Sequence, residues 1–474
     1  MQKTNMMKHT VIMTAVNLIM RSVGLIFNSY LTEKVGSSGI GLFQLVMSVY
    51  SLTVTFSCAG IKLASSRISV EINTLKKNDI FKSLSICLNY AGICGATVGF
   101  TLFLFSDFIG KALISSPSTA FPLKILSVSL PFIAMSSALS GYFTAVEKVP
   151  QYSGIQMLEQ GFKIFTVVII LNKTTYVSPE YACMAIVTGM TASEIFSFCL
   201  SYILKKFTIN KKTDKPSVNL RKILRIAIPD AAGTCVRSIL LTVEHLMIPK
   251  GFLKSGKNTS SSLAAYGNIH AMSLPLLLFP SAILTSLSAL LIPNLAKYHD
   301  LNERKTIICI VKRNLKRTIF YSVFCSFIFW HFSQLFSELV YKTNEAAKYI
   351  KILSPLIPIM YTDIITDGML KGLDQQFHSM KYNIIDSSLC VILVYFLLPR
   401  YSVRGYIFIL YISEIINFIL SIKRLINVCD FKIKGFQVHA IKIPRLFRLK
   451  KYLSAPAVCE YQAYRDRVKR NQAP

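Results

Sequence analysis

Apolar residues fall in about twelve stretches along this chain, separated by shorter polar segments. A helix of roughly 20 apolar residues is long enough to cross a bilayer. The pattern therefore predicts an all-α polytopic membrane protein. The expected spans are residues 9–31, 40–66, 82–106, 121–145, 152–171, 181–204, 223–249, 262–293, 315–337, 349–371, 381–399 and 404–423.

Two of these stretches, 40–66 and 262–293, are longer than a simple crossing requires. A helix that exceeds the membrane thickness must tilt, kink or continue into water. Proline removes a backbone hydrogen bond and bends a helix, so Pro275, Pro280 and Pro293 predict kinks in the second of the two.

Composition and charge agree with a membrane location. Hydrophobic residues make up 52% of the chain and the mean hydropathy is +0.48, yet the formal net charge is +30. The loops on one side of the predicted spans hold 23 Lys and Arg, against 10 on the other. Positive loops remain cytoplasmic, so we expect a multi-pass protein of the cell membrane with both termini in the cytoplasm and no nucleic-acid partner.

The chain repeats itself at an offset of 227 residues. The segment beginning LKILSVSLP at Leu123 matches IKILSPLIP at Ile350, and Pro131 and Gly141 recur as Pro358 and Gly368. Six spans separate the copies, so both enter the membrane from the same side. Parallel repeats of this kind predict about twelve helices in two pseudo-symmetric six-helix lobes around a central cavity, with the substrate between the lobes.

The organisation that follows has four parts. We expect an N-terminal lobe over residues 1–204, a basic cytoplasmic linker over 205–222, a C-terminal lobe over 223–423 and a basic tail over 424–474. The tail is either a disordered basic segment or a short amphipathic helix on anionic lipid.

Cationic residues inside the first two spans are the main candidates for a functional site. Charged side chains at membrane depth usually face a watery cavity or a partner. Arg21 either pairs with a neighbouring helix or lines an anion-accepting cavity. Arg67 is either a cytoplasmic anchor or a ligand, and Lys62 lies more than a turn deeper. Glu159 and Lys163, four residues apart, are expected to form an ordinary intrahelical pair.

The second half carries more acidic groups. Asp230, Arg237 and Glu244 follow each other at intervals of seven and share a helix face. They either neutralise one another or exchange partners during transport. Asp363 and Asp367 share a face of the tenth span, and Asp386 and Glu414 follow on the next two. Like charges so placed favour a shared cation or raised pKa values. The candidates for ion coupling, to Na⁺ or H⁺, are Asp230, Glu244, Asp363, Asp367 and Asp386.

No motif indicates an enzyme. The eleven cysteines contain no CxxC pair and the seven histidines contain no HExxH spacing, so neither a disulfide framework nor a metal centre is predicted. We therefore expect no cofactor and no catalytic residue. Without a nucleotide site, transport must be driven by an ion gradient, the membrane potential or substrate supply.

Three motifs resemble a known family. They are Arg21 in the first span, the loop with Gly36, Gly39, Gly41 and Gln44, and the run GIKLASSR from Gly60 to Arg67. This combination is similar to the polysaccharide-export branch of the multidrug/oligosaccharidyl-lipid/polysaccharide (MOP) exporter superfamily, in particular its stage V sporulation protein B-like group. The likeness covers about residues 9–423, and the chain departs from it in ending after about twelve spans.

The resemblance implies a flippase that moves a polyprenyl-pyrophosphate-linked glycan, such as a peptidoglycan precursor, across the membrane by alternating access. By the family's pattern Arg21, Lys62, Arg67 and Arg237 would bind the anionic head group. Arginine suits phosphate because of its forked donors. Two alternatives remain: a cation-coupled multidrug exporter of the same superfamily, less suited to a base-rich first lobe, and a membrane scaffold that recruits cell-wall enzymes.

Overall fold

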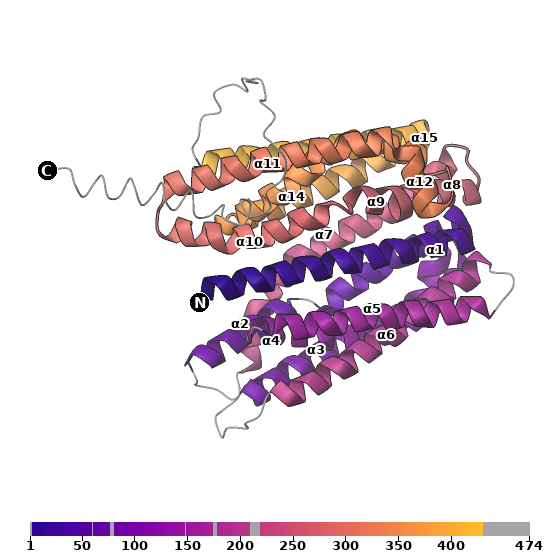
Figure 1. The fold of residues 1–474 in the computed structure, drawn as a ribbon. Helices are drawn as coiled ribbons and strands as arrows, with labels where there is room; N and C mark the ends of the chain where they lie inside the picture. Colours follow the sequence, from indigo (N-terminus) through magenta and orange to yellow (C-terminus); the bar gives the residue numbers. More distant parts are fainter. Residues whose placement is uncertain are drawn as a thin grey trace, which may run out of the picture. The chain divides into compact units, whose positions relative to one another are not determined.

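The structure is a computed structural model that describes residues 2–58, 60–75, 80–146, 148–173, 178–208 and 219–429 (Figure 1). These residues are almost entirely helical, and no strand occurs among them. Seven helices of this part are long and apolar enough to cross a membrane, or up to nine if each of two bent pairs is one span. Helices of this kind, repeated along one chain, indicate a multi-pass membrane protein.

Residue contacts divide the chain into two compact units. The first unit comprises Met1–Ala282, Phe329–Ser354 and Ile384–Ser413, and the second comprises Ile283–Ile328, Pro355–Asn383 and the chain from Glu414. The linker predicted over 205–222 falls mostly on residues 209–218, outside the described residues, as does the tail from residue 430. The division into lobes at that linker remains a prediction.

Most of the first unit consists of long helices joined by short connections (Figure 1). α1 (Gln2–Cys58) contains the first predicted span and most of the second, and a non-helical residue, Gly36 with φ 75°, separates them. The helices that follow are α2 (Ile61–Leu75), α3 (Ile80–Phe108), α4 (Ala120–Ala145), α5 (Val149–Asn172), α6 (Pro179–Thr208) and α7 (Leu220–Lys254).

Shorter helices form the next predicted spans. Residues 262–293 become α8 (Thr259–Gly267), the π-helix η3 (Asn268–Ser273), α9 (Leu274–Leu278) and α10 (Ser281–Asp300). The axis bends by 60° between Leu278 and Ser281, at Pro280, so the predicted kink is confirmed there. The remaining helices are α11 (Arg304–His331), α12 (Ser333–Tyr341), α13 (Ala347–Leu353), α14 (Ile357–Gly372) and α15 (Gln376–Cys429).

The long stretch 40–66 is broken near its C-terminal end, which is one of the outcomes expected for a stretch that exceeds the membrane thickness. The helix stops at Cys58 and restarts at Ile61, with Gly60 at φ 67° between them. This left-handed conformation is open to glycine because it has no Cβ. The boundary of the tail also moves, because α15 continues to Cys429.

Glycines set the spacing of helices in the first unit. A Cβ at Gly41 would overlap the carbonyl oxygen of Leu263, and a Cβ at Gly60 would overlap that of Ala227. The glycines of the family-like motifs therefore let α1 approach α8, and let the start of α2 approach α7, to backbone contact. Close approach through small residues is a common way to pack helices in membranes.

The internal repeat has a structural counterpart in each unit. Gly141 of α4 packs against the backbone of α2 at Lys62, and Gly368 of α14 packs against Ser288 of α10. In both cases the absence of a side chain allows one helix to lie directly on the next. The repeated glycine thus has the same packing role in both copies.

Candidate functional site

Arg21 lies half-buried on α1 and binds the break between α9 and α10. Its Nη1 donates to the carbonyl oxygen of Leu278 at 3.0 Å and to Oγ of Ser281 at 3.2 Å. A helix break leaves backbone carbonyls without their usual N–H partners, and a guanidinium can satisfy them. Both bonds come from Nη1, so Nη2 and Nε have no hydrogen-bond partner within the described residues.

Lys62 and Arg67 lie on the exposed face of α2. The opposite face packs tightly: Ile61 and Ala64 are 1% and 0% exposed, and Ser65 Oγ donates to the carbonyl oxygen of Ala138 at 2.7 Å. This packing fixes the helix while leaving both cations directed away from the core. Neither forms a hydrogen bond or ion pair with another described residue.

The predicted set on α7 separates into an exposed and a buried member. Arg237 is exposed, whereas Glu244 is 6% exposed. The side chain of Asp230 lies outside the described residues. Arg237 interacts electrostatically with Asp386 of α15, and Asp386 in turn faces Glu244. Two carboxylates that interact in this way repel, and a bound cation or a shared proton would relieve that repulsion.

The first unit is not simply base-rich, contrary to expectation. Two half-buried carboxylates, Glu159 on α5 and Glu194 on α6, interact electrostatically with the ammonium group of Lys163. The expected Glu159–Lys163 interaction is present, but with a second acid from the neighbouring helix. Sequence reasoning overlooked Glu194, although a carboxylate within the apolar run TASEIFSF was a sufficient signal.

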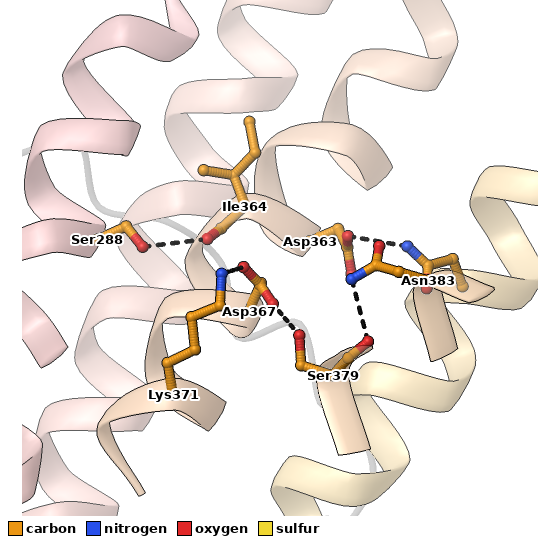
Figure 2. A network of polar contacts seen from close by, with 8 residues as sticks. Ser288, Asp363, Ile364, Asp367, Lys371, Ser379 and Asn383 are labelled. Carbon is orange, nitrogen blue, oxygen red and sulfur yellow. Dashed lines mark hydrogen bonds and ion pairs between the residues drawn. The ribbon is translucent and has the colours of Figure 1, made fainter. Parts of the chain in front are cut away.

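The two acidic residues of α14 have separate hydrogen-bond donors (Figure 2). The shared cation remains a prediction. Lys371 Nζ donates to Asp367 Oδ2 at 2.6 Å, and Ser379 Oγ donates to the other carboxylate oxygen of Asp367. Asn417 Nδ2 donates to Asp363 Oδ2 at 3.2 Å. Each acid has its own donors, because α14 and α15 bring polar side chains opposite it.

Nothing in the described part of the chain resembles a metal centre, since no three His, Cys, Asp or Glu side chains there could hold a metal ion together. One cavity of about 460 Å³ lies in the first unit, between α1, the loop after α3, and the ends of α6, α7 and α8. Hydroxyl groups of Ser116 and Ser260 line it together with Lys250 and Glu180. None of the predicted site residues lines this cavity.

Comparisons with known proteins agree with this architecture. Residues 6–299 match the family described as polysaccharide biosynthesis protein. Stage V sporulation protein B of Bacillus subtilis (strain 168) is 21% identical over 413 residues, covering 85% of this chain and 79% of that protein.

Two solved structures share the fold. The lipid II flippase MurJ in an inward closed conformation superposes with a TM-score of 0.68 at 16% identity, covering 97% of this chain and 100% of that one. An inward-facing multidrug resistance MATE family transporter of the MOP superfamily superposes with a TM-score of 0.66 at 12% identity. The match covers 88% of this chain and 99% of that one. With its all-helical fold and its match over more than half of its length, the chain belongs to the polysaccharide biosynthesis protein family.

Proposed function

We propose that this protein is a flippase that moves a polyprenyl-pyrophosphate-linked glycan across the cytoplasmic membrane. One observation carries the proposal: Arg21, Lys62, Arg67 and Arg237 form no ion pair within 4.0 Å of a carboxylate in the described part of the chain. Cations at membrane depth are costly, so they are retained where an anionic ligand offsets the cost.

Pyrophosphate is the anion that suits these groups. Its oxygens accept the parallel N–H donors of a guanidinium, and Lys62 would add a compact positive charge. Nη2 and Nε of Arg21 are the donors that a phosphate would engage while Nη1 stays on the helix break. Arg21 would thereby connect head-group binding to the bend between α9 and α10.

The finer assignment is a lipid II-like peptidoglycan precursor, used in spore cortex or cell-envelope synthesis. Similarity to stage V sporulation protein B and to the lipid II flippase supports it. Membrane lipids are the surrounding partners, and cell-wall synthesis enzymes are candidate partners on the cytoplasmic side, where we place both termini.

Reconstitution tests the proposal. Purified protein in liposomes with a fluorescent lipid-linked glycan should expose the glycan to an added membrane-impermeant quencher. Arg21→Ala should reduce the rate about tenfold or more, because a charge-assisted hydrogen bond to phosphate contributes on the order of 1.5–3 kcal/mol. Arg21→Lys should restore part of the rate, since it keeps the charge without the forked donors.

Lys222→Ala is the matched control. Lys222 is also a cation of the first unit, but its side chain is 44% exposed and is paired with Glu71 at 2.5 Å. Its removal should leave the flipping rate within about twofold, as expected for an exposed ion pair. Full activity of Arg21→Ala at wild-type protein levels would contradict the flippase assignment.

A multidrug exporter is the second candidate, and the carboxylates Glu159 and Glu194 favour it. Acidic groups inside a helical bundle suit organic cations. Efflux of a fluorescent cation from loaded proteoliposomes measures this activity directly. Saturable efflux that Glu194→Gln abolishes, together with no movement of lipid-linked glycan, would establish the exporter and exclude the flippase.

A further inference from the structure

Two imidazoles and two phenols from four elements meet inside the first unit. Nδ1 of His245 on α7 is hydrogen-bonded to the hydroxyl of Tyr266 on α8 at 3.0 Å. Nε2 of His270 on η3 is hydrogen-bonded to the hydroxyl of Tyr406 on α15 at 2.6 Å. We call these four residues the His–Tyr cluster. Tyr266 and Tyr406 are 1% and 0% exposed, whereas both histidines are only half-buried.

The rings lie against one another. The imidazole centroids of His245 and His270 are 4.8 Å apart with an interplanar angle of 82°, and Tyr266 lies 4.7 Å from His270. Two imidazolium ions at this separation would repel strongly in a medium of low dielectric constant. The cluster can therefore accept one proton but not two.

The hydrogen bonds of the cluster survive protonation. A tyrosine hydroxyl is both donor and acceptor, so it can donate to a neutral imidazole nitrogen and accept from a protonated one. Gain of a proton would only reverse the direction of the bond between His270 and Tyr406, or of that between His245 and Tyr266. This spares the cluster the usual cost of leaving a buried polar group unpaired.

The charged groups around the cluster act on its two phenols. The buried carboxylate of Glu244 interacts electrostatically with Tyr266, Tyr406 and Asp386. From α15, Cys390 also faces Tyr406, and Asp386 accepts a hydrogen bond from Ser413 and interacts with Arg237. From the loop before α13, Glu345 accepts from Asn268 at 3.2 Å. Arg237 is the one cation of this set, and it acts on Asp386.

The backbone at the cluster is also irregular. His270 lies in η3, where the helix changes from α to π geometry. π-Helical turns are rare and occur frequently at functional sites. Asn268, at the start of the same turn, has an Oδ1 atom that is buried without a hydrogen-bond partner among the described residues.

We propose that the His–Tyr cluster binds one proton and that this proton is the coupling ion of transport. The proton resides on the hydrogen-bonded nitrogen of His245 or His270, and it offsets the charge of Glu244, the buried carboxylate that acts on both phenols of the cluster. With the proton bound, the net negative charge near Arg237 is smaller, so Arg237 is available to an anionic head group. Proton release restores the full negative charge of Glu244 and Asp386, which attracts Arg237 away from the head group. This last step rests on the proposed function, but the proton site itself does not.

The site is tested by ¹⁵N-histidine NMR of the full-length protein in nanodiscs, titrated from about pH 8 to about pH 5, which brackets the ordinary titration of histidine. His245→Asn and His270→Gln assign the signals, because each amide can occupy the hydrogen-bonding position of the imidazole nitrogen it replaces. We expect one of the two signals to change from neutral to cationic. Both imidazoles remaining neutral at the lowest pH would overturn the proposal.

Coupling is tested in the reconstituted flipping assay with a pH gradient imposed and the membrane potential held at zero. The gradient should raise the wild-type rate about fivefold or more, the lower end of typical coupling between sites. His270→Gln should abolish this response. His299→Asn is the control, because His299 is exposed on α10, and it should respond as the wild type does.

The two proposals fail in different ways. Glycan movement that is insensitive to the gradient, together with neutral imidazoles, would refute the proton site and leave the flippase assignment intact. An imidazole that gains a proton in a protein that moves no lipid-linked glycan would refute the flippase assignment and leave the proton site intact.

Discussion

The carboxylates of the two units differ in how they are held. In the second unit Asp363 and Asp367 accept hydrogen bonds from different side chains. Lys371 of α14 donates to Asp367 (Figure 2), and Asn417 of α15 donates to Asp363. In the first unit Glu244 and Asp386 interact electrostatically as like charges, and Arg237, the cation that acts on Asp386, is exposed.

This difference separates acids that stabilise a fold from acids that can change partners. A carboxylate with its own donors depends less on a further cation, and removing a donor leaves it unsatisfied. Two carboxylates in repulsion are stabilised by any proton or cation that arrives. Variants in the first unit should therefore change transport, and variants in the second should change stability.

Glu244→Gln should have the largest effect. It removes the charge that balances a protonated His–Tyr cluster while keeping the size of the side chain. We expect the gradient-driven flipping rate to fall about tenfold, corresponding to about 1.4 kcal/mol of lost coupling. The proteoliposome assay measures it, and Asp367→Asn, within the paired network, should not show this loss. Equal losses in both variants would remove the distinction between the units.

Asn417→Ala should be the most destabilising change in the second unit. It removes the donor to Asp363, and Asn417 is 7% exposed, so water cannot easily replace it. Loss of a hydrogen bond to a charged group should cost about 1.5–3 kcal/mol of unfolding free energy. Thermal unfolding in detergent would report it as a lower midpoint. An unchanged midpoint would mean that Asp363 does not depend on this donor.

Ser379→Ala should have a smaller effect. The hydroxyl of Ser379 is one of two donors to Asp367, and Lys371 remains in place. We expect a loss of about 0.5–1.5 kcal/mol, the usual net contribution of one hydrogen bond. The same unfolding measurement applies, and a loss as large as that of Asn417→Ala would indicate that the serine dominates the pairing.

Lys371→Ala should have the smallest effect. Lys371 and Asp367 form an i,i+4 pair whose side chains are 42% and 29% exposed, so solvent screens their attraction. Such pairs contribute about 0.3–0.5 kcal/mol. The unfolding midpoint should shift by less than in Ser379→Ala, and adding salt to the wild type should mimic the change. A larger shift of the unfolding midpoint would show that the ion pair is shielded from solvent.

Much of the fold could be predicted from hydrophobic periodicity. Each of the twelve apolar stretches lies almost entirely on helix, because a segment in lipid must satisfy its backbone groups internally. Breaks within stretches were harder to predict. A proline such as Pro280 indicates a bend from the sequence alone. The need for glycine at position 60 becomes visible only in the structure, where the backbone of α7 lies directly against it.

The candidate site was predictable only in part. A cation such as Arg21 within an apolar run is visible in any sequence, but its partners, Leu278 and Ser281, are more than 250 residues away. The His–Tyr cluster escaped notice for the same reason. His245, His270 and Tyr406 belong to separate helices and share no local spacing.

By itself, then, the sequence determined that the chain is a helical membrane protein with cations inside its apolar stretches, because hydrophobicity and charge act locally along each helix. Only the tertiary structure decided which charged groups are paired. Whether Asp367 meets Lys371 and Ser379, or Glu244 meets Asp386, depends on the rotation and spacing of packed helices. Those are fixed by contacts between residues far apart in the chain.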